Sequence, residues 1–387
     1  MMQASAELLE ARHAAVRGLL AAAGVDGLIV THLPNVFYLS NLAGSAGILV
    51  LTRDAAHLLT DFRYQAAAEA LLQGPHGCPR LHVHIVAQSY EEALVQLLAS
   101  QAPVRLGFEA AHLSYARHEW LRRTLEAGRT PVELAATEGV IEAVRVVKDA
   151  VELATLREAA RRLSAVAHGV LCELEGGLLE TDVAASLEAG MRRAGFSRPA
   201  FDTIVASGPN SALPHARAGG RRLAPGDLVV LDFGGVYNGY CVDLTRTASV
   251  GPPDGEAARL YEAVRAAQEA AIRAVAPGVP ATVVDAAARE VLRARGYGEA
   301  FGHGTGHGLG LEVHELPRLT RPRPPIERPL SPGCVPEPQA LAPGMVFTVE
   351  PGAYLPGFGG VRIEDDVLVT PGGCEVLTTV SRELRVC

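Results

Sequence analysis

Five side chains that are able to bind metal ions follow one another in the second half of the 387-residue chain. They are Asp232, Asp243, His307, Glu350 and Glu364. Four carboxylates and one imidazole form an oxygen-rich set. Such a set suits two hard or borderline divalent ions with shared carboxylates better than one tetrahedral zinc ion. The residue types and their order therefore predict a dinuclear metallohydrolase.

The two aspartates lie on neighbouring predicted strands. Asp232 ends the apolar run 228–232, and Asp243 lies within the next β-branched run. Between them, Asn238-Gly239 is typical of a tight hairpin turn. A single aspartate in such a place is usually a turn former or a cap. Two that flank a hairpin, with three further candidates downstream, favour a shared binding site.

The segment 301–315 contains three histidines, His303, His307 and His314. It is too glycine-rich for a helix, and its glycines let the backbone and the imidazoles approach a ligand closely. A lone histidine is usually a satisfied core or surface group. Three in one short segment favour a site.

Glu350 and Glu364 each lie in an alternating apolar run, and each is predicted on a strand. An isolated carboxylate that faces a core is too costly to bury. These glutamates must therefore be paired or bound to metal.

Hydrophobic periodicity divides the chain into two parts. Residues 1–137 alternate helical and strand patterns, which predicts an α/β domain with a mixed sheet. Its expected elements are helices up to Ala23 and at 66–73, and strands at 26–31, 47–52, 56–60, 82–86 and 104–108. Helical spacing that begins at Ile141 marks the passage into a second domain, 145–387. That domain has amphipathic helices at 150–173, 181–194, 255–275 and 282–295, and the strands that carry the candidate ligands.

Two further histidines, His82 and His84, share one face of a predicted strand. Such a pair suggests metal ligands, but no third ligand follows nearby in the sequence. Exposed strand histidines are the interpretation that the sequence favours.

Composition limits the partners and the compartment. With 35 basic and 43 acidic residues the formal charge is -8, which argues against nucleic acid or an anionic membrane as the main partner. A hydrophobic content of 48% with 20% charged residues is typical of a soluble globular protein. Six cysteines without CxxC spacing predict reduced, scattered thiols. No apolar stretch is long enough for a signal core or a membrane span, so a cytoplasmic location is expected.

Residues 318–339 contain seven prolines. Proline at this density opposes helix and sheet, so an extended loop is predicted. Because it follows His314 directly, this loop is a candidate for the rim of the pocket, with a mobile surface excursion as the alternative.

The ordered Asp, Asp, His, Glu, Glu set, the run HGTGHGLGLEVHE, the TVEPG strand and the GVRIED strand resemble the pita-bread metallopeptidases. Within that family they are most similar to the Xaa-Pro peptidases, aminopeptidase P and prolidase. The resemblance covers about Val140 to the C-terminus by motif, and the N-terminal part by general pattern. It implies an α/β creatinase/prolidase-like domain at 1–137 and an α+β pita-bread catalytic domain at 145–387.

The resemblance also implies a metal centre. Asp232, Asp243, His307, Glu350 and Glu364 would hold two divalent ions, with Asp243 and Glu364 as bridges. Manganese is common in the family, and zinc and cobalt are the alternatives. A hydroxide that bridges the two ions would attack the bond between an N-terminal residue and a penultimate proline.

The remaining roles follow from the same resemblance. His314 would contact the scissile carbonyl or the tetrahedral intermediate, Glu350 would carry a proton to the leaving nitrogen, and His215 would be a further catalytic residue. The implied substrate-binding or supporting positions are His303, His215, Tyr354, Arg362 and Arg63.

Peptide length separates aminopeptidase P from prolidase. Residues Asp61 to Tyr64 resemble the DxRY signature of small bacterial aminopeptidases P. In dipeptide-selective members an N-terminal loop places an arginine over the site, but the comparable loop 40–47 has no basic residue. An Xaa-Pro aminopeptidase is therefore expected, with prolidase as the alternative. Arg63 would favour prolidase if it pointed into the groove instead of pairing with Asp61 on the same strand face.

Other relatives match less well. A non-catalytic pita-bread binding module would lack metal ligands, a creatinase-like enzyme would lack metals, and a methionine aminopeptidase usually lacks the N-terminal domain. Peptides with a penultimate proline are the expected partners. The resemblance further implies a homodimer or a higher homo-oligomer.

Overall fold

The computed structural model describes residues 3–100, 104–322 and 333–387. The chain divides into two compact units. The N-terminal unit is Met1–Arg145 with Pro325–Glu337, and the C-terminal unit is Val146–Pro324 with Pro338–Cys387. No helix among the described residues is both long enough and apolar enough to cross a membrane.

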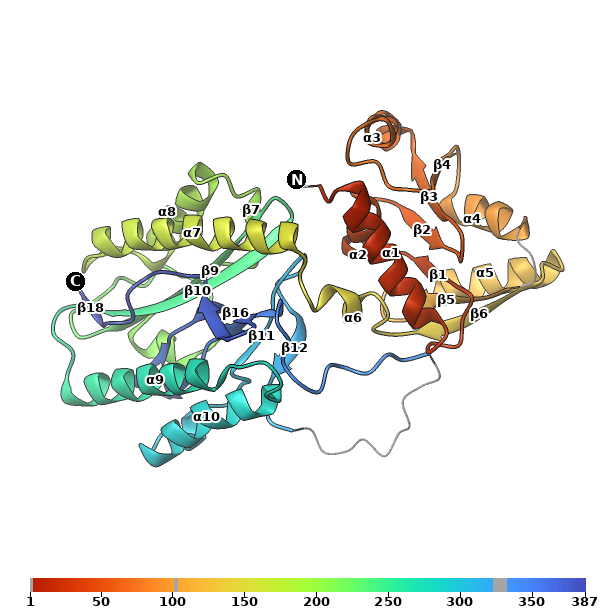
Figure 1. The fold of residues 1–387 in the computed structure, drawn as a ribbon. Helices are drawn as coiled ribbons and strands as arrows, with labels where there is room; N and C mark the ends of the chain where they lie inside the picture. Colours follow the sequence, from red (N-terminus) through yellow and green to blue (C-terminus); the bar gives the residue numbers. More distant parts are fainter. Residues whose placement is uncertain (1–2, 101–103, 323–332) are drawn as a thin grey trace. The chain divides into compact units, whose positions relative to one another are not determined.

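The N-terminal unit contains a six-stranded sheet in the order β4-β3-β2-β1-β5-β6 (Figure 1). The central strands β1, β2 and β3 pair antiparallel, while β3/β4, β1/β5 and β5/β6 pair parallel, so the sheet is mixed as predicted. The strands are β1 (Gly27–Val30), β2 (Ile48–Leu51), β3 (Ala56–Asp61), β4 (Leu81–Val86), β5 (Val104–Glu109) and β6 (Val132–Thr137).

The helices of this unit are α1 (Ala6–Leu20), α2 (Leu33–Ser40), α3 (Phe62–Gln73), α4 (Tyr90–Ala99), α5 (Tyr115–Ala127) and α6 (Glu142–Arg145). Three of them, α2, α4 and α5, were not predicted. Helix α2 is nearly all buried, so it lacks the polar face that produces a periodic signal. Residues such as Ile29, Leu94 and Leu121 form the core between sheet and helices.

Four long helices of the C-terminal unit lie where the periodicity predicted them. They are α7 (Ala150–Glu173), α8 (Glu180–Arg193), α9 (Gly255–Ala274) and α10 (Ala281–Ala294). The helical spacing seen from Ile141 onward is interrupted between α6 and α7. Helix α7 begins there with a capping box, in which Asp149 and Glu152 satisfy each other's backbone N–H groups.

The strands of this unit lie between the pairs α7/α8 and α9/α10 (Figure 1). One sheet has the order β18-β10-β9-β7 with β8 also on β9, a second has the order β12-β11-β13-β16-β17, and β14 pairs with β15. The strands are β7 (Arg198–Pro199), β8 (Ile204–Ser207), β9 (Leu228–Tyr237), β10 (Tyr240–Ser249), β11 (Gly306–Gly308), β12 (Glu315–Leu319), β13 (Val346–Val349), β14 (Gly352–Leu355), β15 (Gly359–Arg362), β16 (Asp365–Thr370), β17 (Gly373–Val376) and β18 (Arg385–Val386).

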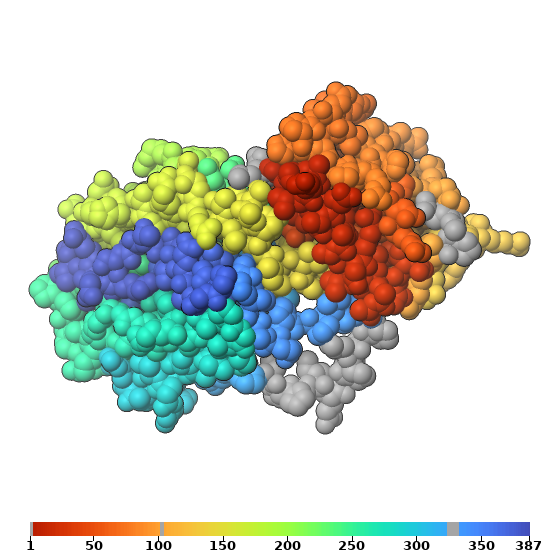
Figure 2. Space-filling view, viewed as in Figure 1, coloured from red at the N-terminus to blue at the C-terminus, as the bar shows by residue number. Residues whose placement is uncertain are grey.

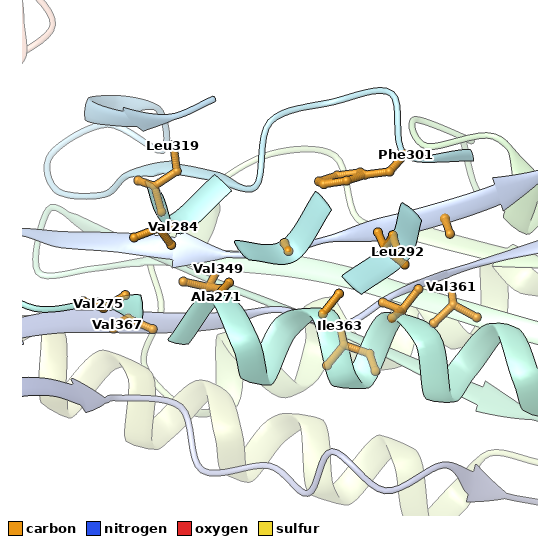
Figure 3. Close-up of a cluster of buried hydrophobic side chains, with 14 of the residues drawn as sticks. Ala271, Val275, Val284, Leu292, Phe301, Leu319, Val349, Val361, Ile363 and Val367 are labelled. Carbon is orange, nitrogen blue, oxygen red and sulfur yellow. The ribbon is translucent and has the colours of Figure 1, made fainter. Parts of the chain in front are cut away.

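A large apolar cluster holds these layers together. Figure 3 shows side chains of α9 and α10, among them Ala271 and Leu292, against strand residues such as Val349, Val361 and Val367. In Figure 2 the C-terminal segment, in blue, lies between α7 and α9. Hydrogen bonds between its backbone and the side chains of Ser164 in α7 and Tyr261 in α9 hold it there.

The proline-rich segment 318–339 is not an extended loop throughout. Arg318 and Leu319 belong to β12, which contradicts the prediction for these two residues, because the chain is still paired with β11 at this point. Cys334 forms a bridge with Glu138 in the N-terminal unit. Residues 323–332, where most of the prolines occur, lie outside the described residues.

Candidate metal centre and active site

The hairpin of β9 and β10 places Asp232 and Asp243 on one sheet face. Asn238 (φ 51°) and Gly239 (φ 94°) form the turn, as predicted. Thr245 lies opposite Asp232 in the register, and Asp243 is two residues from Thr245. The two carboxylates are therefore diagonal neighbours on the same side of the sheet.

The prediction that Asp232 ends its strand was wrong. Strand β9 continues through Gly234 and Gly235 to Tyr237. Gly234 lies opposite Asp243, and a Cβ atom there would come within 2.5 Å of the Val242 carbonyl oxygen and 2.7 Å of the Phe201 ring. Glycine at this position therefore reflects close packing inside the strand and not a turn.

His307 lies in β11, between β12 and β13. Its glycine neighbours are required by that close packing. A Cβ atom on Gly306 would lie 1.8 Å from the Thr348 carbonyl oxygen, and one on Gly308 would lie 2.0 Å from the Leu316 carbonyl oxygen. The glycine-rich segment thus brings an imidazole into the middle of a sheet.

Glu350 and Glu364 lie at strand ends, which corrects the prediction that they lie within alternating strands. Glu350 follows β13, and Glu364 stands between β15 and β16. Strand β13 is buried at all four positions, because side chains cover both faces of its sheet. The apolar run therefore did not alternate as the strand pattern assumed.

All five predicted metal ligands meet in one cavity of about 640 Å3 in the C-terminal unit. Asp243, His307 and Glu364 each offer a ligand atom within 4.8 Å of the other two. The Nε2 atom of His307 lies 3.3 Å from Oε1 of Glu350. The sequence-predicted residues that line this cavity are His215, Asp232, Asp243, His303, His307, His314, Glu350, Arg362 and Glu364.

The chemistry of the donor set fits divalent cations. Among the described residues, Oδ1 of Asp232 and Oε1 of Glu364 are buried without a hydrogen-bond partner. Burial and then the neighbouring carboxylates raise the pKa of Asp243 and of Glu364 well above the usual range. Burial also raises the pKa of Glu350. Concentrated buried negative charge with open lone pairs is costly unless a cation neutralises it.

The His307 ring is oriented for metal binding. Its Nδ1 atom lies 3.2 Å from the Gly308 carbonyl oxygen, so Nδ1 carries the proton that this oxygen accepts. The Nε2 lone pair is then directed toward the carboxylates. A backbone acceptor of this kind fixes the tautomer of a metal-binding histidine.

Arg362, Tyr354 and His303 form a hydrogen-bonded chain behind the ligands. Arg362 donates to Asp232 through Nη2 and to the Tyr354 hydroxyl oxygen at 2.6 Å through Nη1. The Tyr354 hydroxyl lies 2.9 Å from Nε2 of His303, whose Nδ1 lies 2.8 Å from the Gly304 carbonyl oxygen. Because Tyr354 already accepts from Arg362, its O–H donates to His303. These hydrogen bonds thus orient the Asp232 carboxylate and the His303 ring together.

His314 lies next to the ligands. Its ring stands 4.3 Å from the His307 ring, edge to face. Burial, His307 and His215 lower the pKa of His314 to about 4, so the ring is neutral at pH 7. A neutral imidazole can donate a hydrogen bond from one nitrogen to a developing negative charge.

Arg63 is held within the N-terminal unit. Asp61 ends β3 and caps α3, and Arg63 lies in the first turn of α3, so the two do not share a strand face as expected. Arg63 donates to both carboxylate oxygens of Asp61, at 2.8 and 2.7 Å, and Tyr90 donates to the same group at 2.8 Å. The condition under which Arg63 would hold a substrate carboxylate is therefore not met.

Several residues that serve the site were not among the predicted ones. Thr245 donates to Glu364 at 2.5 Å, and Thr348 donates to Glu350 at 3.2 Å. Arg318 lies opposite His307 in the β11–β12 ladder and lines the cavity, and Arg217 lines it as well. The even spacing of His314 and Arg318 was the available signal, since residues an even number apart on a strand share one face. The many prolines that follow favoured a loop instead of a strand here.

Comparisons with known proteins agree with this geometry. Residues 154–371 match metallopeptidase family M24, and residues 12–147 match the creatinase/prolidase N-terminal domain. The chain is 34% identical to an Xaa-Pro dipeptidase of Pyrococcus horikoshii over 93% of this chain and 94% of the relative.

Solved structures are similar over nearly the whole chain. An Xaa-Pro dipeptidase from Bacillus anthracis superposes with a TM-score of 0.88 at 34% identity, covering 98% of this chain and 100% of the other. An X-Pro aminopeptidase from Thermotoga maritima gives a TM-score of 0.82 at 32% identity, covering 96% and 99%. The expected pairing of a creatinase-type N-terminal domain with a pita-bread catalytic domain is confirmed. The chain belongs to metallopeptidase family M24 and is a metallopeptidase that carries a creatinase/prolidase N-terminal domain.

Proposed function

We propose that this metallopeptidase is an Xaa-Pro peptidase, which hydrolyses the bond between an N-terminal residue and a proline. The observation that carries the proposal is the meeting of the five candidate metal ligands and three further histidines in one cavity. The relatives named Xaa-Pro dipeptidase support the same substrate class. A tertiary amide has no N–H after the scissile bond, and this accounts for a dedicated enzyme.

Asp232, Asp243, His307, Glu350 and Glu364 would hold two divalent ions. The oxygen-rich set favours manganese, with zinc and cobalt as alternatives. When bound, the ions would supply hydroxide at neutral pH and polarise the scissile carbonyl.

The side chains around the ligands have separate tasks. His314, neutral at pH 7, donates a hydrogen bond to the oxygen that becomes negative when the carbonyl is attacked. Desolvation raises the pKa of Glu350, so it can accept a proton and pass it to the proline nitrogen as that nitrogen leaves. Arg362 holds Asp232 in place, and Tyr354 holds His303.

Arg318 favours dipeptides as the preferred substrates. Its side chain is exposed in the cavity, and among the described residues it has no hydrogen-bond or ion-pair partner. It lies close enough to His314 to contribute to the lowered pKa of that ring. A free guanidinium beside the catalytic histidine can bind the carboxylate of a C-terminal proline through two hydrogen bonds.

The expectation of an aminopeptidase rested on the loop 40–47, which has no basic residue, and on the DxRY-like residues 61–64. The DxRY-like residues have a structural task in the N-terminal unit, since Asp61 caps α3 and binds Arg63 and Tyr90. They therefore give no information about peptide length.

An Xaa-Pro aminopeptidase remains the second candidate. The loop 40–47 has no basic residue, and an X-Pro aminopeptidase is among the close structural relatives. If that loop approached the substrate, nothing in it would hold a terminal carboxylate.

The test compares Xaa-Pro, its C-terminal amide and Xaa-Pro-Yaa in the wild type, Arg318→Ala and Arg217→Ala. Arg217 is the matched control because it also lines the cavity but stands 3.7 Å from Asp202, with 88% of its side chain exposed. A hydrogen bond between charged groups is worth about 1.5–3 kcal/mol, so Arg318→Ala should lower kcat/KM for the dipeptide by about 10-fold to 150-fold.

The dipeptide should exceed the amide and the tripeptide in the wild type and in Arg217→Ala. Arg318→Ala should remove this preference. A tripeptide cleaved better than its dipeptide, with no selective loss in Arg318→Ala, would instead establish the aminopeptidase.

The cellular setting is part of the proposal. None of the six cysteines, all of which the structure describes, forms a disulfide, which is consistent with a cytoplasmic location. By resemblance to its family, the chain is expected to form a homodimer or a higher homo-oligomer. Light scattering coupled to size-exclusion chromatography measures the molar mass of the assembly directly.

A further inference from the structure

Three histidines form a cluster on the sheet of the N-terminal unit, outside the catalytic cavity. They are His57 of β3 and His82 and His84 of β4, named here the histidine cluster. Strands β3 and β4 pair parallel, with His57 opposite His82 and Leu59 opposite His84. Since side chains alternate along a strand, all three imidazoles stand on one face.

Strand pairing supplies the third imidazole that the sequence did not show. A metal ion bound by His82 and His84 alone would have only two protein ligands, both from one strand. His57 lies far earlier in the sequence and joins them through the β3–β4 ladder. Three imidazoles with a solvent position are a common ligand set for a transition-metal ion.

The His57 and His84 nitrogens already stand at a coordinating distance, and His82 must turn to join them. Nδ1 of His57 lies 3.1 Å from Nε2 of His84. Two nitrogens bound tetrahedrally to one zinc ion at about 2.0–2.1 Å are separated by about 3.3 Å. The His57 ring centre lies 5.1 Å from that of His82 and 5.4 Å from that of His84. His82 is the exposed member, so its ring can turn toward the other two at little cost.

The charge state of the cluster also suits a metal ion. Burial, followed by the neighbouring imidazoles, lowers the pKa of His57 and of His84. Both are neutral at pH 7, which is the form that binds metal. Among the residues that the structure describes, none of the three rings has a carboxylate as a hydrogen-bond or ion-pair partner. Nothing acidic therefore competes for the imidazoles.

We propose that His57, His82 and His84 bind one divalent transition-metal ion of the zinc or nickel class. Imidazole nitrogens suit zinc, nickel and copper, whereas carboxylates suit manganese and magnesium. The histidine cluster contains nitrogen ligands only, and the catalytic centre contains mainly oxygen ligands. The two sites thus differ in the metals that they select, and the cluster does not depend on the peptidase proposal.

The test measures nickel binding by the full-length, untagged, manganese-loaded chain. Equilibrium dialysis with Ni2+ is compared for the wild type, His57→Ala, His82→Ala and His112→Ala. His112 is the matched control: it belongs to a histidine pair in the same unit, stacked on His32 at 3.6 Å between ring centres. Two rings stacked face to face do not direct their nitrogens to one point.

The wild type and His112→Ala should bind one more equivalent of Ni2+ than His57→Ala. His82→Ala should weaken this site at least tenfold, because one of three ligands is lost. Peptidase activity should be unchanged in all four proteins, which also shows that each variant is folded. His82→Ala keeps the test decisive if His57→Ala fails to fold, since His82 is exposed. Equal nickel stoichiometry and affinity in the wild type and His82→Ala would overturn the three-histidine site.

Discussion

Lys148 is the only lysine of the chain, and it is buried in an ion pair. Its Nζ lies 3.1 Å from Oε2 of Glu315, and the two side chains are 0% and 7% exposed. Glu315 follows His314 in the chain and lines the same cavity. We therefore expect this pair to govern both the stability of the C-terminal unit and the position of His314.

The change Lys148→Met keeps the length of the side chain and removes its charge. Loss of one partner from a buried ion pair costs about 3–5 kcal/mol, because the remaining charge stays buried without compensation. Glu315 keeps a hydrogen bond from the Glu312 N–H at 3.0 Å, so the lower end, about 3 kcal/mol, is expected. For a domain of this size the Tm should then fall by about 6–12 °C.

Thermal unfolding of the metal-loaded protein measures the effect. The control is Arg157→Met, which removes an exposed pair: the Arg157 and Glu375 side chains are 47% and 41% exposed. Exposed pairs contribute at most about 1 kcal/mol. The double variant Lys148→Met/Glu315→Gln should recover part of the loss, because no buried charge remains. The reasoning is refuted if Lys148→Met is as mild as Arg157→Met, or if the double variant is less stable than Lys148→Met alone.

Three further predictions concern the cavity. Asp243→Asn or Glu364→Gln should lose at least one ion by elemental analysis and nearly all activity; full activity with two ions would contradict a dinuclear centre. His215→Ala, His303→Ala and His314→Ala should retain metal but lose about 100-fold or more in kcat/KM, the scale of a lost oxyanion donor, whereas metal loss in one of them would place that ring among the ligands. Because burial raises the pKa of Asp243 and Glu364, the stability from their protonated forms is fully present below about pH 4 and is lost as the pH rises through the raised values. The Tm of the chelator-treated protein should therefore fall as the pH rises above about 4 and recover with Mn2+, and a flat profile would count against this account.

Local chemistry determined much of the candidate site from sequence. The ligand types and their order predicted the metal centre because carboxylates and imidazoles in apolar or glycine-rich runs have few other uses. The Asn238-Gly239 turn set the hairpin, since few other pairs accept positive φ at both positions. The four long helices of the C-terminal unit followed from amphipathic spacing, which is a local property of the chain.

Tertiary pairing decided what spacing could not. Glu350 and Glu364 lie at strand ends, which the sequence did not show. Their strands are buried on both faces, and this removes the alternation of apolar and polar residues that locates a residue within a strand. Arg318 reaches the cavity only because β12 pairs with β11, and His57 joins His82 only through the β3–β4 register. Register depends on partners far away in the chain, so no local pattern records it.

Burial decided the remaining functional properties. The sequence contains one lysine, but only the packing of the C-terminal unit makes it the buried partner of Glu315. Likewise, Asp61 and Arg63 formed a substrate motif by resemblance, yet the start of α3 turns them into a cap and an ion pair. The charge state of a side chain depends on its surroundings in three dimensions, and these surroundings exist only in the folded chain.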